Sequence, residues 1–412
     1  MRILIVTAGS RGDVAPFTGL GRRLRDAGHE VSLAAHPSFA SLIDGCGLGL
    51  RPVPGDPQEL LRGWSRAATR DEARALTRAY ADGLAEGVAD AVAAGTDLVL
   101  TAQGPSPLSR TAGAAFGVPV VGTHLVPSVA TAEFRLPGAR GADGPEPEGN
   151  LAAGRAVERR TEAAFAGAVT RVRAHLGLPE TGHGAPEDTG PVFHGYSPLV
   201  IPRPADWPSR AEVVGYWWPA RPDEWRPPAE LVDFLQAGPP PVFIGFGSMA
   251  PGDGERLGEL VTSAVERAGV RAVVQAGWAG LGGSGPTGPD VLAVGDLPHD
   301  WLFPRTAAVV HHAGAGTTGA GLRAGVPALP VPVLTDQPFW AARLHGLGVA
   351  PPPLPFRDLT AESLAAGITA CLAEPSYRRR AAALASRMAA EDGAGAVLAH
   401  VSAMDTNRRD LL

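Results

Sequence analysis

The residues best suited to binding an anion follow a short apolar run, 307–310: His311, His312, Gly314, Gly316, Thr317 and Thr318. The run has the length of a buried parallel strand, and the threonines stand where a helix is expected to begin. Glycines let the backbone approach a ligand closely, and the first turn of a helix presents unpaired N–H groups. Because such N–H groups attract negative charge, the stretch predicts a phosphate-binding turn.

Groups that bind hydroxyls follow the next apolar run, 326–333, which prolines interrupt. Asp336 and Gln337 come soon after it, so a carboxylate and an amide are expected at the carboxyl end of the next strand. A phosphate site with hydroxyl-binding groups beside it is typical of a nucleotide-sugar site. The same pair also fits a helix start, with Asp336 as the cap and Pro338 at the first helical position.

The two adjacent histidines allow other interpretations. Neighbouring side chains on a strand point to opposite sides, so the binding of one metal ion by both His311 and His312 is disfavoured. On its own, such a pair is more often structural. The surrounding glycines and threonines, together with the Asp-Gln pair, favour ligand binding here.

A second candidate site lies near the start of the chain. Residues 3–7 are typical of a strand, a helix is expected from about Pro16, and 31–35 fit the next strand. This βαβ unit places a polar turn at the carboxyl end of the first strand, where open α/β sheets bind ligands: Ser10, Arg11, Gly12 and Asp13. The turn lacks the G-x-G-x-x-G pattern, and the second strand ends at Ala35 and His36 rather than at an acid. A dinucleotide site is therefore disfavoured.

Asp13 has two possible roles in that turn. A carboxylate in a site that excludes water can accept a proton from a bound hydroxyl as that hydroxyl attacks. Aspartate is also a preferred cap, so the residue could instead cap the helix expected from Pro16. Position alone favours neither role.

These segments resemble the family 1 glycosyltransferases of the GT-B fold, in particular the bacterial enzymes that glycosylate antibiotics. In that family the first segment reads HHGGAGTT and is later followed by DQ, whereas here Ala313 replaces a glycine. We expect that replacement to be mild, because a methyl group is small. The stretch VGYWWP and the strand near 242–247 resemble the family's linker and the start of its C-terminal half. The resemblance covers nearly the whole chain and is strongest over 1–30 and 239–345.

The resemblance implies an α/β protein of two doubly wound, Rossmann-like domains that face each other across a cleft. A chain of 412 residues is too long for one ordinary domain, and strands alternate with helices in both halves. We expect an acceptor-binding domain at 1–205, a linker at 206–240 and a donor-binding domain at 241–380. Helices at 381–412 are expected to cross back in part to the first domain.

Three details of this architecture are also expected. The aromatic residues between 202 and 241 should fill the hinge. Residues 136–149 form either a mobile loop over the acceptor pocket or an ordinary exposed connection. Asn150 is expected to cap a long helix at about 151–176.

The resemblance assigns roles residue by residue. Asp13 is the presumed catalytic base, which Ser10, Arg11 and Gly12 accompany in the turn at the cleft. The donor diphosphate is expected to contact Ser248, His312, Gly314, Gly316 and Thr317. Asp336 and Gln337 match the pair that binds the donor sugar, and the nucleoside is expected near Leu297 and His299. For His311 the resemblance offers no role.

The expected reaction is a direct transfer that inverts the anomeric centre. Sugar transferases that depend on a metal typically carry an Asp-x-Asp motif, which this sequence lacks, so no metal site and no cofactor are expected. We expect a deoxysugar donor linked to dTDP rather than UDP, and a hydrophobic aglycone such as a polyketide, macrolide or glycopeptide. The alternatives are a non-catalytic nucleotide-sugar-binding activator of another transferase and a nucleotide-sugar epimerase of similar architecture.

Composition excludes several other classes. The net charge is −6 and the arginines are scattered, so no nucleic-acid partner is expected. Cys46 and Cys371 are far apart and fit neither a metal site nor a redox motif. No run is long enough for a membrane span and the first apolar run is too short for a signal peptide, so we expect a cytoplasmic protein without a membrane partner. The oligomeric state is not predicted.

Overall fold

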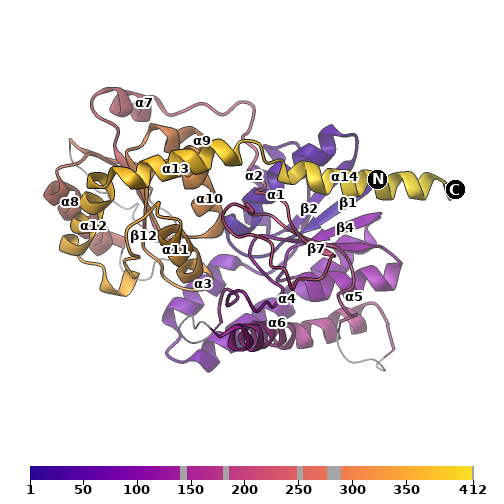
Figure 1. The fold of residues 1–412 in the computed structure, drawn as a ribbon. Helices are drawn as coiled ribbons and strands as arrows, with labels where there is room; N and C mark the ends of the chain where they lie inside the picture. The colour runs from indigo at the N-terminus through magenta and orange to yellow at the C-terminus, as the bar shows by residue number, and fades with distance from the viewer. Residues whose placement is uncertain (140–145, 180–184, 248–253, 276–288, 411–412) are drawn as a thin grey trace. The chain divides into compact units, whose positions relative to one another are not determined.

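The computed structural model describes residues 1–139, 146–179, 185–247, 254–275 and 289–410 (Figure 1). The chain forms two compact units. The first consists of Met1–Asp223 and Asp392–Leu412, and the second of Glu224–Glu391. Within the described residues each unit contains one parallel β-sheet with helices between its strands.

The first unit is built on a seven-stranded sheet with the order β3-β2-β1-β4-β5-β6-β7. Its strands are β1 (Arg2–Val6), β2 (Glu30–Ala35), β3 (Gly49–Pro52), β4 (Leu98–Thr101), β5 (Val120–His124), β6 (Val192–His194) and β7 (Ala211–Val213). The central strands are almost fully buried, as expected for a parallel sheet that is covered on both faces. The strand order reverses between β1 and β4, and such reversals create ligand-binding crevices at the carboxyl ends of strands.

The helices of the first unit are α1 (Arg11–Asp26), α2 (Ala40–Asp44), α3 (Pro57–Arg66), α4 (Arg70–Ala93), α5 (Ser106–Phe116), α6 (Pro147–His175) and α14 (Gly393–Asp410). The predicted start of α1 at Pro16 is wrong by five residues, because Ser10 and Asp13 form a capping box that starts the helix at Arg11. The predicted cap at Asn150 is also wrong. The helix starts at Pro147, and the amide of Asn150 instead donates to the carbonyl of Ala132 over 3.1 Å.

The last helix, α14, belongs to the first unit and packs on α1. The indole N–H of Trp217 donates to the carbonyl of Gly393 over 3.1 Å, which fixes the start of α14. Near its end, the Arg408 guanidinium lies 3.0 Å from the Asp97 carboxylate, which also binds Arg2 at 3.1 Å. Segments from both ends of the chain therefore meet at one carboxylate, and Figure 1 shows the N-terminus beside α14.

The second unit is built on a five-stranded parallel sheet with the order β10-β9-β8-β11-β12. Its strands are β8 (Val242–Gly245), β9 (Ala272–Gln275), β10 (Val291–Val294), β11 (Ala308–His311) and β12 (Ala328–Pro330). The strand order reverses between β8 and β11, where Gly245 pairs with His311. β12 ends before the predicted residue 333, since Pro330 and Pro332 have no N–H to donate to a neighbouring strand.

The helices of the second unit are α7 (Ala229–Gln236), α8 (Gly254–Ala268), α9 (His299–Leu302), α10 (Ala315–Ala324), α11 (Gln337–Gly346), α12 (Ala361–Ala373) and α13 (Pro375–Met388). α8 and α12 pack together against the sheet, where their apolar side chains join the core. α10 and α11 follow β11 and β12, so both helices begin at the carboxyl edge of the sheet.

The predicted linker, 206–240, is divided at Asp223 between the two units, and it contains strand β7. Its aromatic side chains pack within one unit or the other. The ring of Trp207 lies 4.5 Å from that of His194, and Trp217 lies 5.7 Å from Phe17, all in the first unit. In the second unit, Trp225 meets Trp301 edge to face at 5.6 Å.

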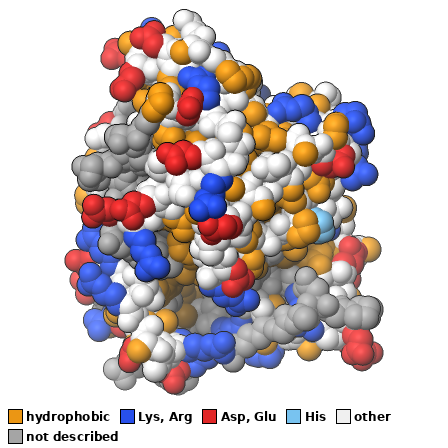
Figure 2. Space-filling view, turned by 90° about the vertical axis from the view of Figure 1, so that its left-hand side faces the viewer, with side chains coloured by type: hydrophobic (Ala, Val, Ile, Leu, Met, Phe, Trp, Pro, Cys, Tyr) orange, Lys and Arg blue, Asp and Glu red, His pale blue; other side chains and the backbone are white. Residues whose placement is uncertain are grey.

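Figure 2 shows basic and acidic side chains interspersed over one face of the molecule. Mixed signs of this kind give a surface without one dominant charge. No helix in the described part of the chain is both long and apolar enough to cross a membrane.

Two glycines test the packing of the first unit. A Cβ on Gly19, in α1, would lie 1.7 Å from the carbonyl oxygen of Trp218, whereas a Cβ on Gly83, in α4, would meet nothing within 4 Å. We expect Gly19→Ala to lower the free energy of unfolding by about 3 kcal/mol, because backbone must move. Gly83→Ala should raise it by about 1 kcal/mol, since alanine is the better helix former. Urea unfolding measures both, and a Gly19→Ala protein as stable as the wild type would contradict the packing of α1.

Candidate functional site

The predicted phosphate-binding turn connects β11 to α10 in the second unit. β11 ends at His311, Gly314 is the N-cap with φ −65° and ψ 148°, and α10 begins at Ala315. The N–H groups of Gly316 and Thr317 lie in the first turn of α10, where a helix has no carbonyl to receive them. The structure thus places Gly314, Gly316 and Thr317, the residues predicted to bind an anion, together at the start of α10.

The His312 ring lies between two glycines. A Cβ on Gly247 would lie 2.6 Å from Cε1 of the ring, and a Cβ on Gly314 would lie 2.6 Å from Nε2. The residue is partly exposed, but its Nδ1 is buried and no partner in the described structure meets hydrogen-bond geometry; the backbone of Gly245 lies near enough to oppose in part the effect of burial on the pKa. Burial lowers the pKa of His312 to about 4. At neutral pH the ring is therefore uncharged, and it offers one N–H group and one lone pair.

His311 is fully buried on the other side of the backbone. Its Nδ1 accepts a hydrogen bond from the N–H of Ala313 over 3.1 Å, and its Nε2 has no partner within the described ranges. Burial lowers the pKa of His311 to about 3, so this ring is also neutral.

Ala313 has a φ of 62°, in the left-handed region. The expectation of a mild replacement rested only on the size of the methyl group. In this conformation the Cβ of an L-residue crowds the backbone, which costs about 1–2 kcal/mol relative to glycine. The replacement of the family's glycine by Ala313 therefore raises the conformational energy of the backbone at this turn.

Three unpaired polar atoms lie within this short segment. Besides the two histidine nitrogens, the hydroxyl of Thr318 is buried without a partner among the described residues. Each such group costs about 1–3 kcal/mol if it stays unsatisfied. All three atoms lie at the end of β11 and the start of α10, in the segment that the sequence proposed for anion binding, and Thr318 is one of the residues named there.

Asp336 and Gln337 stand at the start of α11, as one of the two sequence interpretations predicted. The Asp336 carboxylate accepts hydrogen bonds from the Thr335 hydroxyl and the Trp340 indole, each over 2.9 Å. Burial raises the pKa of Asp336, an effect that these bonds and one from the Ala315 backbone oppose. The bond from Ala315 links Asp336 to the first turn of α10.

Gln337 is buried, and its amide oxygen accepts from the N–H groups of Val333 at 2.8 Å and Leu334 at 3.1 Å. Those bonds close the loop between β12 and α11. Thr335, in the same loop, has a φ of 61°, which a β-branched residue adopts only under strain. Among the described non-glycine residues, only Thr335 and Ala313 have positive φ, and both flank the candidate site.

The residues expected near a nucleoside lie at the start of α9. His299 is the first residue of α9, and its ring stacks on Phe303 at 4.3 Å and meets Phe243 at 5.7 Å. Leu297 precedes it and is partly exposed. His299 is close enough to His311 to contribute to the lowered pKa of that ring. Ser248, the remaining predicted residue of this unit, lies outside the described residues.

In the first unit, Asp13 lies in the first turn of α1 rather than in a loop before the helix. One of its carboxylate oxygens accepts from the N–H of Ser10 at 2.7 Å and from the Ser10 hydroxyl at 3.0 Å. Gly9, with φ 131°, gives this carboxylate room, because a Cβ there would lie 2.3 Å from the same oxygen. Asp13 therefore helps to start α1 as the third helical residue, paired with the N-cap Ser10 in a capping box, and it is not the N-cap itself.

Three comparisons with known proteins agree with these features. Residues 3–85 match the Glycosyltransferase family 28 N-terminal domain, and residues 283–404 match the Erythromycin biosynthesis protein CIII-like, C-terminal domain. Over 408 residues the chain is 37% identical to the O-mycaminosyltylonolide 6-deoxyallosyltransferase of Streptomyces fradiae, and 95% of each protein is covered. The chain belongs to the family 1 natural-product glycosyltransferases. It is therefore a glycosyltransferase that acts on an aglycone.

The similarity extends to plant enzymes. The glycosyltransferase is 33% identical over 429 residues to the sterol 3-beta-glucosyltransferase UGT80A2 of Arabidopsis thaliana. The alignment covers 100% of this chain and 67% of the plant protein. Among solved structures, SsfS6 from Streptomyces sp. SF2575 superposes with a TM-score of 0.66 at 22% identity, with 98% of this chain and 99% of SsfS6 covered. That likeness establishes the fold, and the predicted GT-B architecture is confirmed.

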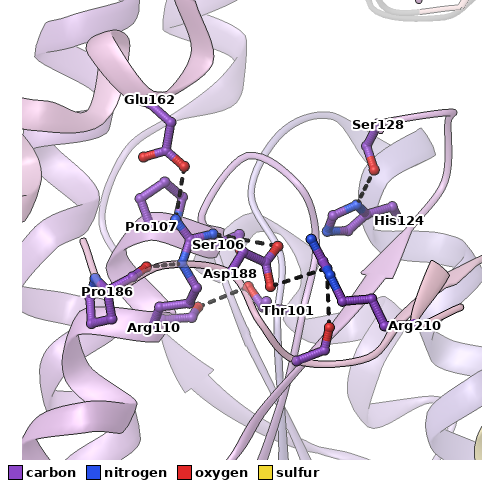
Figure 3. Close-up of polar contacts among 12 residues, drawn as sticks. Thr101, Ser106, Pro107, Arg110, His124, Ser128, Glu162, Pro186, Asp188 and Arg210 are labelled. Carbon is purple, nitrogen blue, oxygen red and sulfur yellow. Dashed lines mark hydrogen bonds and ion pairs between the residues drawn. The ribbon is translucent and has the colours of Figure 1, made fainter. Parts of the chain in front are cut away.

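The glycosyltransferase also contains a buried hydrogen-bond network of His124, Ser128 and His194 that the sequence analysis did not predict. At the carboxyl ends of β5 and β6, the Ser128 hydroxyl lies 2.6 Å from Nδ1 of His124 (Figure 3) and 2.9 Å from Nε2 of His194. Nδ1 of His194 donates to the carbonyl of Glu212 at 3.1 Å, which leaves Nε2 to accept the Ser128 proton. His124 and His194 are the last residues of β5 and β6 and belong to no sequence motif, so the residue pattern did not indicate them.

Figure 3 shows a second polar network beside His124 and Ser128. Arg110 donates to Glu162 at 2.8 Å and to the carbonyl of Pro186 at 2.9 Å, and it lies 3.7 Å from Asp188. Arg210 lies 3.8 Å from the other oxygen of Asp188. These contacts tie α5 and α6 to the segment that leads into β6, and Arg210 stands directly before β7.

The buried histidines predict how stability depends on pH. Burial lowers the pKa of His194 to about 3, so the folded protein does not protonate this ring until far below 6.5, whereas the unfolded chain does. The stability conferred by the neutral ring is therefore present above pH 6.5 and declines as the pH falls from 6.5 towards 3. His194 and His311 should each contribute up to about 1.4 kcal/mol per pH unit.

Urea unfolding at pH 7 and pH 5 measures this decline. The variant His194→Gln cannot take up the proton, so it should lose less stability between the two pH values than the wild type, whatever its absolute stability. Equal losses in the two proteins would show that His194 does not resist protonation in the folded state.

Proposed function

We propose that the enzyme transfers a deoxysugar from a dTDP-linked donor to a hydroxyl of a natural-product aglycone, with inversion at the anomeric carbon and without a metal ion. The observation that carries this proposal is the group of unpaired polar atoms between β11 and α10, at the edge where the strand order reverses. The name of the Streptomyces fradiae relative supports a deoxysugar, and the SsfS6 structure complexed with thymidine diphosphate supports a dTDP donor.

The second unit would hold the leaving diphosphate with neutral groups. One helix N-terminus contributes about 0.3–1 kcal/mol when exposed and up to roughly 2 kcal/mol when partly buried. Hydrogen bonds to a charged oxygen contribute about 1.5–3 kcal/mol each, so His312 and the N–H groups of Gly316 and Thr317 together would exceed the helix contribution. Asp336, held by Thr335 and Trp340, would accept hydrogen bonds from the sugar hydroxyls.

The first unit would supply the base. We propose that the acceptor hydroxyl gives its proton to the Asp13 carboxylate while its oxygen forms a bond to C1 of the sugar. The bond from C1 to the diphosphate breaks on the opposite face, and its electron pair leaves with the diphosphate, so the anomeric centre inverts. Ser10 would keep the carboxylate oriented through the two hydrogen bonds to one of its oxygens.

A second candidate function is glucosyl transfer to a sterol. The 33% identity to the Arabidopsis thaliana sterol 3-beta-glucosyltransferase over the full length of this chain favours it. The same donor site would serve both functions, since only the aglycone and the sugar differ.

A donor and acceptor matrix tests the proposal. Purified protein is incubated with dTDP-deoxysugars or UDP-glucose, each with a macrolide aglycone, an aromatic polyketide or a sterol, and mass spectrometry detects the product. A deoxysugar added to a macrolide or polyketide supports the proposal, and glucose added only to the sterol supports the second candidate. Proton NMR of the anomeric centre reports inversion, and retained configuration would rule out the single displacement.

The variant Asp13→Asn tests the base. Turnover should fall about 10²–10⁴-fold, because the amide cannot accept the proton, while the affinity for the nucleoside diphosphate should not change. Asp26→Asn, at the other end of α1, is the matched control and should turn over like the wild type. Undiminished turnover in Asp13→Asn would remove this residue from the chemistry.

Removal of metal ions tests the metal-independent part of the proposal. We expect dialysis against EDTA to leave the rate of sugar transfer unchanged, since the leaving group would be held by N–H groups and a neutral imidazole. A rate that is lost on chelation and restored by Mg²⁺ or Mn²⁺ would contradict it.

A further inference from the structure

We propose that His311 is a positioning residue that holds the turn at Ala313 in the conformation from which α10 presents its N–H groups to the donor diphosphate. The inference rests on the proposed function, because it assigns this buried histidine a task at the proposed diphosphate site.

The direction of one hydrogen bond defines what the His311 ring does. The N–H of Ala313 points at Nδ1 over 3.1 Å, so Nδ1 must offer its lone pair, and the ring proton sits on Nε2. The ring is 0% exposed, so water does not compete for that lone pair. The Ala313 N–H is thereby paired inside the protein, in a turn where no backbone carbonyl of the described residues accepts it.

The ring is mounted on a rigid support. His311 is the last residue of β11, where it pairs with Gly245 of β8 and Pro330 of β12. Its carbonyl also accepts a hydrogen bond from the N–H of Val331 over 2.8 Å. Because the backbone is held from both sides, Nδ1 occupies a defined position relative to the sheet.

The turn that the ring supports is one that alanine resists. Ala313 has φ 62°, and glycine would adopt this conformation without a steric penalty. The next residue, Gly314, is the N-cap of α10, so a change in the Ala313 dihedral angles would rotate the first turn of the helix. Support for Ala313 therefore sets the direction of the N–H groups of Gly316 and Thr317.

Stability alone does not account for an imidazole at this position. Nε2 of His311 is buried without a partner in the described structure, and an apolar side chain would avoid the cost of that unpaired N–H group. The neighbouring His312 ring lies between Gly247 and Gly314, on the other side of the strand. The two histidines thus have different roles in this proposal: His312 contacts the diphosphate, and His311 supports the backbone of the turn at Ala313.

Four variants test this assignment through the affinity for dTDP, measured by calorimetry. His311→Asn places an amide oxygen near the position of Nδ1 and should bind dTDP within about threefold of the wild type. His311→Gln and His311→Leu offer no acceptor at that position, and both should bind about tenfold more weakly. Adding Ala313→Gly to His311→Leu should restore most of the affinity, because glycine keeps the turn without support.

The Michaelis constant for the aglycone should stay unchanged in all four variants, which separates positioning of the donor site from a general loss of structure. The Asn and Gln variants are both polar, so their comparison remains decisive even if His311→Leu does not fold. Equal dTDP affinity in the Asn and Gln variants would overturn the inference. A wild-type protein that binds neither dTDP nor UDP would instead overturn the proposed function.

Discussion

The reversal of strand order between β8 and β11 is the constraint on which the second unit of this glycosyltransferase depends. Parallel strands that are neighbours in space but distant in sequence must send their connecting helices to opposite faces, which leaves their carboxyl ends uncovered. Gly245 pairs with His311 at this point, so the residues after each strand meet there. Gly247 and His312 come from these two ends and contact one another as a result.

Several buried polar groups at this edge have no hydrogen-bond partner among the described residues. Buried N–H, hydroxyl and imidazole groups normally find partners within the protein, yet here three remain unpaired within the described residues. Two backbone positions nearby, Ala313 and Thr335, adopt a conformation that disfavours their side chains. Unpaired groups and strained backbone angles of this kind cost free energy, which the surrounding sheet compensates.

The sequence predicted several strands well because apolar runs depend on local residues. β1, β2 and β11 lie within one residue of the expected runs 3–7, 31–35 and 307–310, whereas the short strands β3, β6 and β7 were not predicted. The starts of α1 and α6 were missed, because a capping box and a proline decide them rather than the apolar pattern. For the site, the predicted grouping of Gly314, Gly316 and Thr317 with His312 followed from their spacing. The left-handed turn at Ala313 and the hydrogen bond from the Ala313 N–H to His311 were not predicted, since both depend on backbone angles that no residue pattern encodes.

The attachment of α14 to the first unit bears on the construction of hybrid enzymes. The segment that forms the second unit, Glu224–Glu391, is an insertion in the chain of the first, because Trp217 binds Gly393 and Asp97 binds Arg408. A chimaera made by exchanging everything after residue 223 would bring a foreign last helix to α1 and break these contacts. Recombination at two junctions, one near 223 and one near 391, exchanges the second unit and leaves the native partner of α1 in place.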